Sequence, residues 1–268
     1  MINTITIIGD LEKLLTRRPD QDLNVCSSSY EFEKVCSKLS KTNTVYSIDL
    51  LGCGRSDRPA FTYTNFLYVE LITNFIKHII GEKTDVIVSG ESCPFVLMAC
   101  ANDDSIINKV VMINPPNLVK MAKIPTKASK LFKKLICTFI YNLNVNKKTI
   151  LQKFIFSYYY AQNDIKERDI LTYFESSHKD HTHSKYLYAC QKSRYLNANI
   201  VHCLSRLTNS IYIIVGNSNP ENILAANEYQ NYLPSIEIKG IAKTKQMPHM
   251  EKPEEFFSDV KIFLSDAQ

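Results

Sequence analysis

The chain has 268 residues, of which 45% are apolar and 22% charged, and its formal net charge is +5. This composition suits one large α/β domain, or such a domain with an insertion. No apolar run approaches the ~20 residues that a membrane-spanning helix needs, and the first residues lack the pattern of a secretory signal. We therefore expect a cytoplasmic protein with no transmembrane segment, and the modest charge predicts no nucleic-acid partner.

The cysteines and glycines of the chain indicate which kinds of functional site it can form. The eight cysteines are scattered and contain no Cys-x-x-Cys pair, which favours reduced thiols over zinc ligation or a disulfide framework. The chain has only seven glycines and no glycine-rich phosphate loop. Three histidines in "SHKDHTH", residues 177–183, lack a recognised metal-ligand spacing. We expect neither a metal nor another cofactor.

The first 116 residues alternate strand and helix patterns. Strands are predicted at residues 2–8, 44–50, 85–90 and 109–114, with a short additional strand that ends in the serines at 27–29. Helices are predicted at residues 31–41, 64–80 and 94–102, and Gly81 ends the second of these. Strand–helix–strand units at this spacing imply right-handed crossovers and a parallel sheet with helices on both faces.

The pattern changes after Pro116. Residues 117–196 show helical segments and no convincing strand, and the α/β pattern resumes with strands at 210–216 and 235–240 and a final helix at 253–266. We therefore predict an α/β core formed by residues 1–116 and 197–268, and a helical cap formed by residues 117–196. The predicted sheet is mostly parallel and has about eight strands.

Three stretches, in this order, resemble motifs of the α/β-hydrolase fold family. "DLLGCGRSDRP" is similar to the family's Asp-x-x-Gly-x-Gly-x-Ser loop, and "VIVSGESCP" stands where its nucleophile elbow is expected. "MPHMEKPEEFFSDVKIFL" is similar to the segment in which a catalytic His shortly precedes Glu-x-Pro and the last helix. The resemblance implies the α/β-hydrolase fold, and it implies catalysis by a serine nucleophile and a histidine base.

Within this resemblance, Ser92 is the predicted nucleophile and His249 the predicted general base. The backbone N–H of Cys93 is the predicted oxyanion donor, because it follows the nucleophile at the start of a helix. Position 94 is Pro where the family has a second glycine, which the first turn of a helix tolerates. A backbone N–H of Ser27 or Ser28 is the predicted second donor, although the segment lacks the family's His-Gly.

The triad acid departs from the family pattern. The family places an Asp after the penultimate core strand, whereas this chain has Asn219 there. Asn219 can orient an imidazole but supplies no full charge, and Glu221 is the alternative if the loop bends.

The predicted cap suggests a substrate. Residues 117–160 contain nine lysines and no Asp or Glu, along with many large apolar residues. We expect an apolar cleft between cap and core that binds an acyl group, with Glu91, Phe132 and Phe139 as substrate-binding residues. The lysines are expected to face water, and a peripheral contact of the basic cap with an anionic membrane stays open, as does the oligomeric state.

These residues predict a serine hydrolase or acyltransferase that acts on an ester, thioester or amide with an apolar acyl part. Two alternatives remain open. The departures at positions 94 and 219 and the missing His-Gly also fit a hydrolase-fold binding protein with impaired catalysis. A lyase or cofactor-free oxygenase of the same fold would tolerate altered site residues too.

Overall fold

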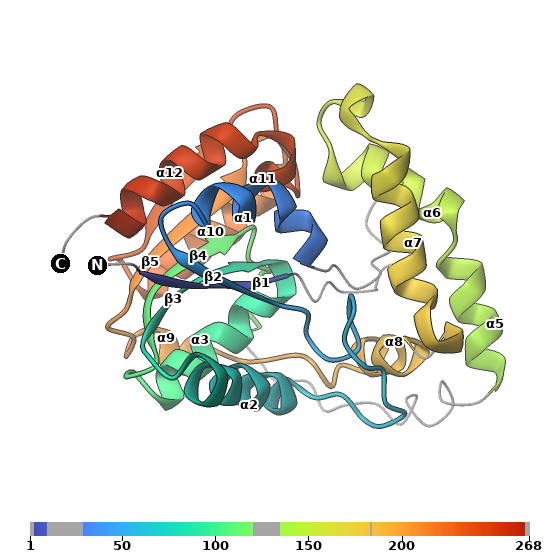
Figure 1. The fold of residues 1–268 in the computed structure, drawn as a ribbon, viewed down its shortest axis with the longest axis horizontal. Coiled ribbons are helices and arrows are strands. Elements are labelled where there is room, and N and C mark those ends of the chain that lie inside the picture. The colour runs from blue at the N-terminus through green and yellow to red at the C-terminus, as the bar shows by residue number, and fades with distance from the viewer. Residues whose placement is uncertain (1–2, 10–28, 120–134, 183, 266–268) are drawn as a thin grey trace.

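The computed structural model describes residues 3–9, 29–119, 135–182 and 184–265, and within them a single parallel sheet forms the centre of the molecule (Figure 1). Its six strands run in the spatial order β2-β1-β3-β4-β5-β6. Their bounds are β1 Thr4–Ile8, β2 Thr44–Ile48, β3 Thr84–Ser89, β4 Ile107–Ile113, β5 Ser210–Gly216 and β6 Glu237–Ile241. The parallel α/β architecture expected from the sequence is confirmed, with six strands in these ranges instead of about eight. The short strand predicted before residue 29 lies outside the described residues.

The central strands are buried on both faces, which explains their continuous apolar runs. All six residues of β3 are buried. Val86 and Val88 belong to the apolar cluster on one face of the sheet, and Ile87 belongs with Ile5 and Ile7 to the cluster on the other face. Alternation along each strand therefore divides the core between two layers of helices.

Those two layers are visible on either side of the sheet in Figure 1. One layer contains α1 (Glu33–Leu39) and α12 (Pro253–Ser265). The other contains α2 (Asn65–Phe75) and α3 (Cys93–Asn102). The remaining core helices are α9 (Val201–Leu204), α10 (Pro220–Tyr232) and α11 (Pro248–Glu251), and a short 3-10 turn η1 (Ser29–Phe32) leads into α1.

The helix predicted at residues 64–80 is present but buries fewer residues than its apolar spacing suggested. Helix α2 continues as a π-helical segment, η2 (Ile76–Ile80), and ends at Gly81 with φ 75°. Val69, Ile72 and Ile76 are buried, whereas Phe66 is 71% and Ile79 62% exposed. The 3.6-residue periodicity underlying the prediction is lost where the helix widens, and both exposed residues lie near its ends.

Between β4 and β5 the described residues form helices and no strand. These helices are α5 (Leu135–Asn144), α6 (Lys147–Lys153), α7 (Glu167–Thr182), α8 (Lys185–Lys192) and the short α9 described above, with short segments η4 (Phe154–Tyr158) and η5 (Gln162–Asp164) after α6. Helices α5, α6 and α7 stand beside the carboxyl ends of the strands at the right of Figure 1. None of the helices in the described ranges is both long and apolar enough to cross a membrane.

A buried guanidinium ties helices of the segment between β4 and β5 to the loop at residues 51–59. Arg58 is 3% exposed and donates hydrogen bonds to the carbonyl oxygens of Gly54 and Ser176 at 2.7 Å each. Its Nε donates to the Ser184 hydroxyl at 2.9 Å. The loop at residues 51–59 therefore binds the end of α7 and the start of α8 through one planar, charged group.

Candidate functional site

The turn between β3 and α3 decides where a nucleophile could stand. In a nucleophile elbow the reactive side chain sits on a sharp, strained turn between strand and helix. Here the residue with a left-handed backbone at that turn is Gly90, with φ 54°. Glycine adopts this conformation without a Cβ penalty. The strained position of the elbow therefore has no side chain, and the matching five-residue stretch is Val88–Ser92, two residues earlier than the sequence pattern suggested.

Ser92 lies past this turn, in the entry to α3. Its backbone is right-handed helical, with φ −79° and ψ −18°, and the residue is 0% exposed. Its hydroxyl donates a 2.7 Å hydrogen bond to the carbonyl oxygen of Gly9, which follows β1. Ser92 is therefore a buried hydrogen-bond link between the end of β1 and the start of α3.

Cys93 does not offer a free oxyanion donor either. Its backbone N–H is taken up by the 3-10 turn, where it bonds to the Gly90 carbonyl oxygen. The side chain is fully buried, with Sγ 3.7 Å from the Val88 carbonyl oxygen. The other predicted donors, Ser27 and Ser28, lie outside the described residues.

His249 is positioned by α11 within an apolar environment. The residue is 0% exposed, and its ring stacks on Phe32 at a centroid distance of 4.6 Å and tilts against Phe256 at 5.8 Å. Neither ring nitrogen has a hydrogen-bond partner among the described residues, and Nε2 lies 3.8 Å from a carboxylate oxygen of Glu31. The predicted hydrogen bond between Ser92 and His249 is therefore not formed.

The two residues predicted for the acid position of the triad lie at the start of α10. Asn219 is the N-cap of this helix, and its side-chain oxygen accepts a 3.2 Å hydrogen bond from the backbone N–H of Glu221. Glu221 is exposed. Neither side chain bonds to His249. An Asn directly before a Pro is a frequent helix start, and this signal in the sequence could have indicated the capping role.

Asn114 organises the carboxyl edge of the sheet. It follows β4 with φ 42° and donates from its amide to the carbonyl oxygens of Lys245 and Gln246, at 3.1 and 2.8 Å. Its side-chain oxygen accepts from the Gly216 N–H at 3.0 Å. A Cβ on Gly216 would stand 1.6 Å from the Lys245 carbonyl oxygen. The loop that leads to His249 is thus held against β4 and β5 by an amide and a glycine.

The predicted substrate-binding residues do not meet in one cleft. Glu91 lines a small cavity of about 10 Å³ beside Pro94 and Tyr229. Phe139 is 67% exposed on α5, and Phe132 lies outside the described residues. Tyr141 and Val145 are the residues of this segment that turn inward, and a substrate contact of Phe139 stays a prediction.

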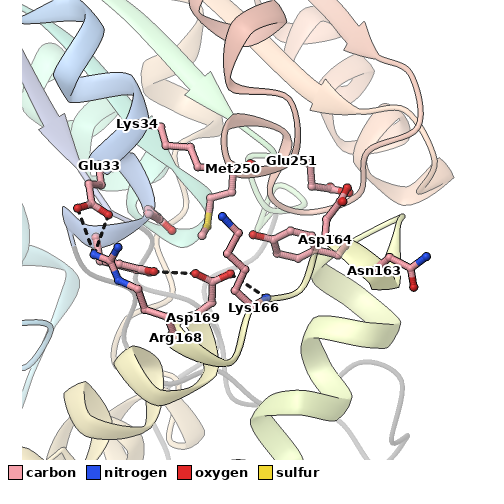
Figure 2. A pocket seen from close by; sticks show the side chains of 12 residues that line it. Glu33, Lys34, Asn163, Asp164, Lys166, Arg168, Asp169, Met250 and Glu251 are labelled. Carbon is pink, nitrogen blue, oxygen red and sulfur yellow. Dashed lines mark hydrogen bonds and ion pairs between the residues drawn. The ribbon is translucent and has the colours of Figure 1, made fainter.

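A larger cavity lies between the residues around η1 and α11 and the segment that follows β4, and it is polar. It measures about 360 Å³. Figure 2 shows Glu33, Lys34, Met250 and Glu251 along one wall, and along the other Asp164, Lys166, Arg168 and Asp169 from the segment between β4 and β5. Tyr30, Glu31, Tyr159 and Asn163 complete the lining. The described cleft is therefore lined mainly by charged groups and not by the apolar side chains expected for an acyl group.

Burial alters proton affinities in this cavity. It raises the pKa of Glu251 to about 7, although the backbone N–H groups of Lys245 and Tyr160 donate to this carboxylate at 2.7 and 2.6 Å. The pKa of Tyr30 is raised to about 12 by burial and by the hydrogen bond that its hydroxyl donates to Asp169 at 2.6 Å. Burial, followed by the negative charges of Asp169 and Glu251, also raises the pKa of Tyr159.

Within the histidine-rich segment at residues 177–183, the structure describes the surroundings of His178. His178 stacks on Phe174 at 4.2 Å, and its Nδ1 contacts the Ser177 hydroxyl at 2.7 Å. His183 lies outside the described residues. In the part of the chain that the structure describes, no group of three or more potential ligands is arranged to hold a metal ion.

Comparisons with known proteins agree with this fold. A family model described as alpha/beta hydrolase fold matches residues 25–253. No curated protein matches the chain. Several solved structures of similar fold are called hydrolases, and at their level of identity they support the fold alone.

Three of these structures illustrate the likeness. An alpha/beta hydrolase enzyme from a Medee basin deep-sea metagenome library has a TM-score of 0.74 and 16% identity, with 100% of this chain and 90% of that chain covered. A meta-cleavage product hydrolase from Pseudomonas fluorescens IP01 has a TM-score of 0.77 and 12% identity, with 99% and 92% covered. A 2-hydroxy-6-oxo-6-phenylhexa-2,4-dienoate hydrolase from Rhodococcus sp. strain RHA1 has a TM-score of 0.76 and 13% identity, with 99% and 91% covered.

Sequence identities this low establish a shared fold but not a shared reaction. The family match is more informative, because it spans most of the chain and includes β2 to β6 and the whole described part of the cap. Together with the strand order and the helical insertion after β4, it shows that the chain belongs to the α/β-hydrolase fold family.

Proposed function

We propose that this protein is a ligand-binding member of the α/β-hydrolase fold family that does not use a serine nucleophile. One observation carries the proposal: the strained residue of the turn after β3 is Gly90, which has no side chain to attack a substrate. Nucleophilic catalysis needs a nucleophile within hydrogen-bond reach of a base that a third group orients. No such set of three is assembled among the described residues.

The neighbouring residues support the same proposal. Ser92 uses its hydroxyl to bind the Gly9 carbonyl oxygen, and His249 packs between Phe32 and Phe256 without a hydrogen-bonded orienting group. Asn219 serves as a helix cap. Each of these residues has a structural role that the catalytic role would disrupt.

The binding half of the proposal rests on the cavity between core and cap. A volume of about 360 Å³ is at the lower end of the range for small-molecule sites. Its walls come from two parts of the fold, η1 with α11 and η5 with α7, so a ligand there would contact both.

A serine hydrolase or acyltransferase is the second candidate, and the names of the similar solved structures favour it. For this activity Ser92 would have to break its bond to Gly9, leave the helical conformation and reach the ring of His249. The proposed binding protein needs none of these changes.

A fluorophosphonate probe and a series of p-nitrophenyl esters separate the two candidates. The wild-type chain, Ser92→Ala and Ser37→Ala would be treated side by side, the last as a matched exposed serine whose hydroxyl bonds only within its own helix. We expect no covalent labelling and no ester turnover above the uncatalysed rate in any of the three. Labelling of the wild type that disappears in Ser92→Ala alone would establish the serine hydrolase and reject the proposal.

A further inference from the structure

Exposed apolar side chains are concentrated in one part of the segment between β4 and β5. Nine large apolar residues are exposed in the described part of the chain, and five of them lie within residues 139–160. These five are between 38% and 67% exposed, and they are Phe139, Leu143, Leu151, Phe156 and Tyr160. Single exposed apolar residues are ordinary, whereas such a concentration in a short stretch indicates a surface that contacts a partner. We call residues 135–160 the outer stretch.

Helix α5, which begins the outer stretch, has an apolar outer face. Phe139 and Leu143 are four residues apart and therefore lie on the same face of the helix, and both are exposed. Tyr141 and Val145 are buried in the cluster on the inner side. Figure 1 shows α5 and α6 along the outer edge of the molecule, with α7 on the side nearer the sheet. A helix that is apolar on two faces is normally covered on both, so the outer face of α5 is expected to have a partner.

The charged residues of the outer stretch have one sign. Residues 135–160 contain three lysines and no Asp or Glu. Lys147 and Lys148 are exposed and stand at the start of α6, directly after the outward-facing Leu143 and the end of α5. A partner that complements both features must offer apolar groups together with negative charge.

An anionic lipid bilayer has both properties, and a second copy of this chain fits less well. In a two-fold pair the same surface meets itself, so the lysines of one copy would face the lysines of the other. Helix α5 has ten residues, about half of the ~20 that a membrane-spanning helix needs. It is therefore long enough to lie along a membrane surface but too short to cross the bilayer.

We propose that the outer stretch is a peripheral binding surface for an anionic lipid bilayer. The side chains of Phe139 and Leu143 insert between the lipids, and Lys148 contacts the negatively charged headgroups. This role goes beyond the proposed ligand binding and does not depend on it, because the outer face of α5 is separate from the residues that line the polar cavity.

Cosedimentation of the full chain with lipid vesicles tests the proposal. One set of vesicles contains equal parts of phosphatidylcholine and phosphatidylserine, and the other contains phosphatidylcholine alone. Each lysine near an anionic surface strengthens binding roughly fivefold, so the two exposed lysines predict at least about tenfold tighter binding to the anionic vesicles. Raising the ionic strength from about 0.1 M to about 1 M should release most of the protein, because the Debye length falls from about 10 to about 3 Å. Equal binding to both sets, or no binding to the anionic set, would overturn the proposal.

Substitutions of the apolar residues locate the contact on α5. Phe139→Ser and Leu143→Ser replace exposed side chains, so we expect both variants to fold normally and to bind anionic vesicles about tenfold more weakly. Phe66→Ser and Leu224→Ser are the matched controls, since these side chains are 71% and 66% exposed and lie outside the outer stretch. Wild-type vesicle affinity in a folded Phe139→Ser protein would reject the proposal.

A charge substitution tests the electrostatic part. Lys148→Gln should weaken binding to the anionic vesicles roughly fivefold and leave the weak binding to phosphatidylcholine unchanged. Lys41→Gln removes an equally exposed charge from the loop after α1 and should have no such effect. An equal loss in the two lysine variants would mean that net charge, and not this surface, attracts the lipid.

A fluorescent reporter distinguishes the bilayer from a second copy of the chain. The sequence contains no tryptophan, so Phe139→Trp introduces a single one on the outer face of α5. Its emission should shift to shorter wavelength when anionic vesicles are added, whereas the emission of Phe66→Trp should not. Sedimentation velocity without lipid gives the opposing result: a dimer that Phe139→Ser dissociates would assign this face to a second copy and overturn the proposal.

Discussion

Replacing Ser92 with Ala separates a structural serine from a catalytic one. The wild-type hydroxyl is fully buried and donates at 2.7 Å to the Gly9 carbonyl oxygen, which joins the end of β1 to the start of α3. Alanine removes the donor and leaves that carbonyl oxygen without this partner. A buried acceptor that loses its donor destabilises a protein by about 1 to 3 kcal/mol.

Urea unfolding followed by circular dichroism measures this loss. We expect the midpoint of Ser92→Ala to fall with an unchanged slope, which would correspond to a decrease of about 1 to 3 kcal/mol in the free energy of unfolding. Thermal unfolding should show a decrease of about 2 to 4 °C for each kcal/mol. Ser37→Ala, at an exposed helix position, should stay within about 0.5 kcal/mol of the wild type.

Equal or greater stability of Ser92→Ala would refute this reasoning. Catalytic groups are often held in arrangements that reduce stability, so removing one tends to be neutral or stabilising. That outcome would therefore support the role of Ser92 as a nucleophile.

Three further predictions follow from the same contacts. Gly90→Ala should lower the free energy of unfolding by about 1 to 2 kcal/mol in the urea assay, because the new Cβ is unfavourable at φ 54°, and an unchanged midpoint would contradict the left-handed turn. Because burial raises the pKa of Glu251 from 4.5 to about 7, the folded state holds this proton more tightly than the unfolded one. The free energy of unfolding should therefore decline as the pH rises from about 4.5 to about 7, and Glu251→Gln should reduce this decline. An identical pH profile in the variant would exclude Glu251 as the source of the decline. Arg58→Lys should lower the free energy of unfolding by about 2 to 4 kcal/mol, because an ammonium cannot reproduce the forked contacts to Gly54, Ser176 and Ser184. Amide hydrogen exchange in α7 and α8 should become faster. Unchanged exchange there would show that another contact holds these helices.

Residues of the candidate site were harder to predict than the elements that carry them. The pattern Gly-x-Ser occurs at residues 90–92, and reading it as an elbow gave Ser92 the reactive position. The fold uses the glycine of this pattern as the strained residue, so the register is shifted by two. A motif match counts positions along the chain, whereas the role of each residue depends on the sign of φ at the turn.

His249 illustrates the same limit. Its place before Glu-x-Pro and the last helix was correctly recognised, but its side chain points toward Phe32 of η1, more than two hundred positions earlier. The polar cavity was missed for a related reason. Its walls combine charged residues of η1, η5, α7 and α11, and no single segment of the sequence carries the pattern.

By itself the sequence determined the alternation of strands and helices, the parallel sheet and the helical segment between β4 and β5, since runs of buried residues and helix-ending glycines are local signals. Only the tertiary structure decided that Gly90 occupies the turn, that Ser92 bonds to Gly9, and that carboxylates from core and cap face one another. Periodicity reports which side of an element is apolar. The direction of one side chain at a turn, and the neighbours it meets there, depend on how distant segments pack.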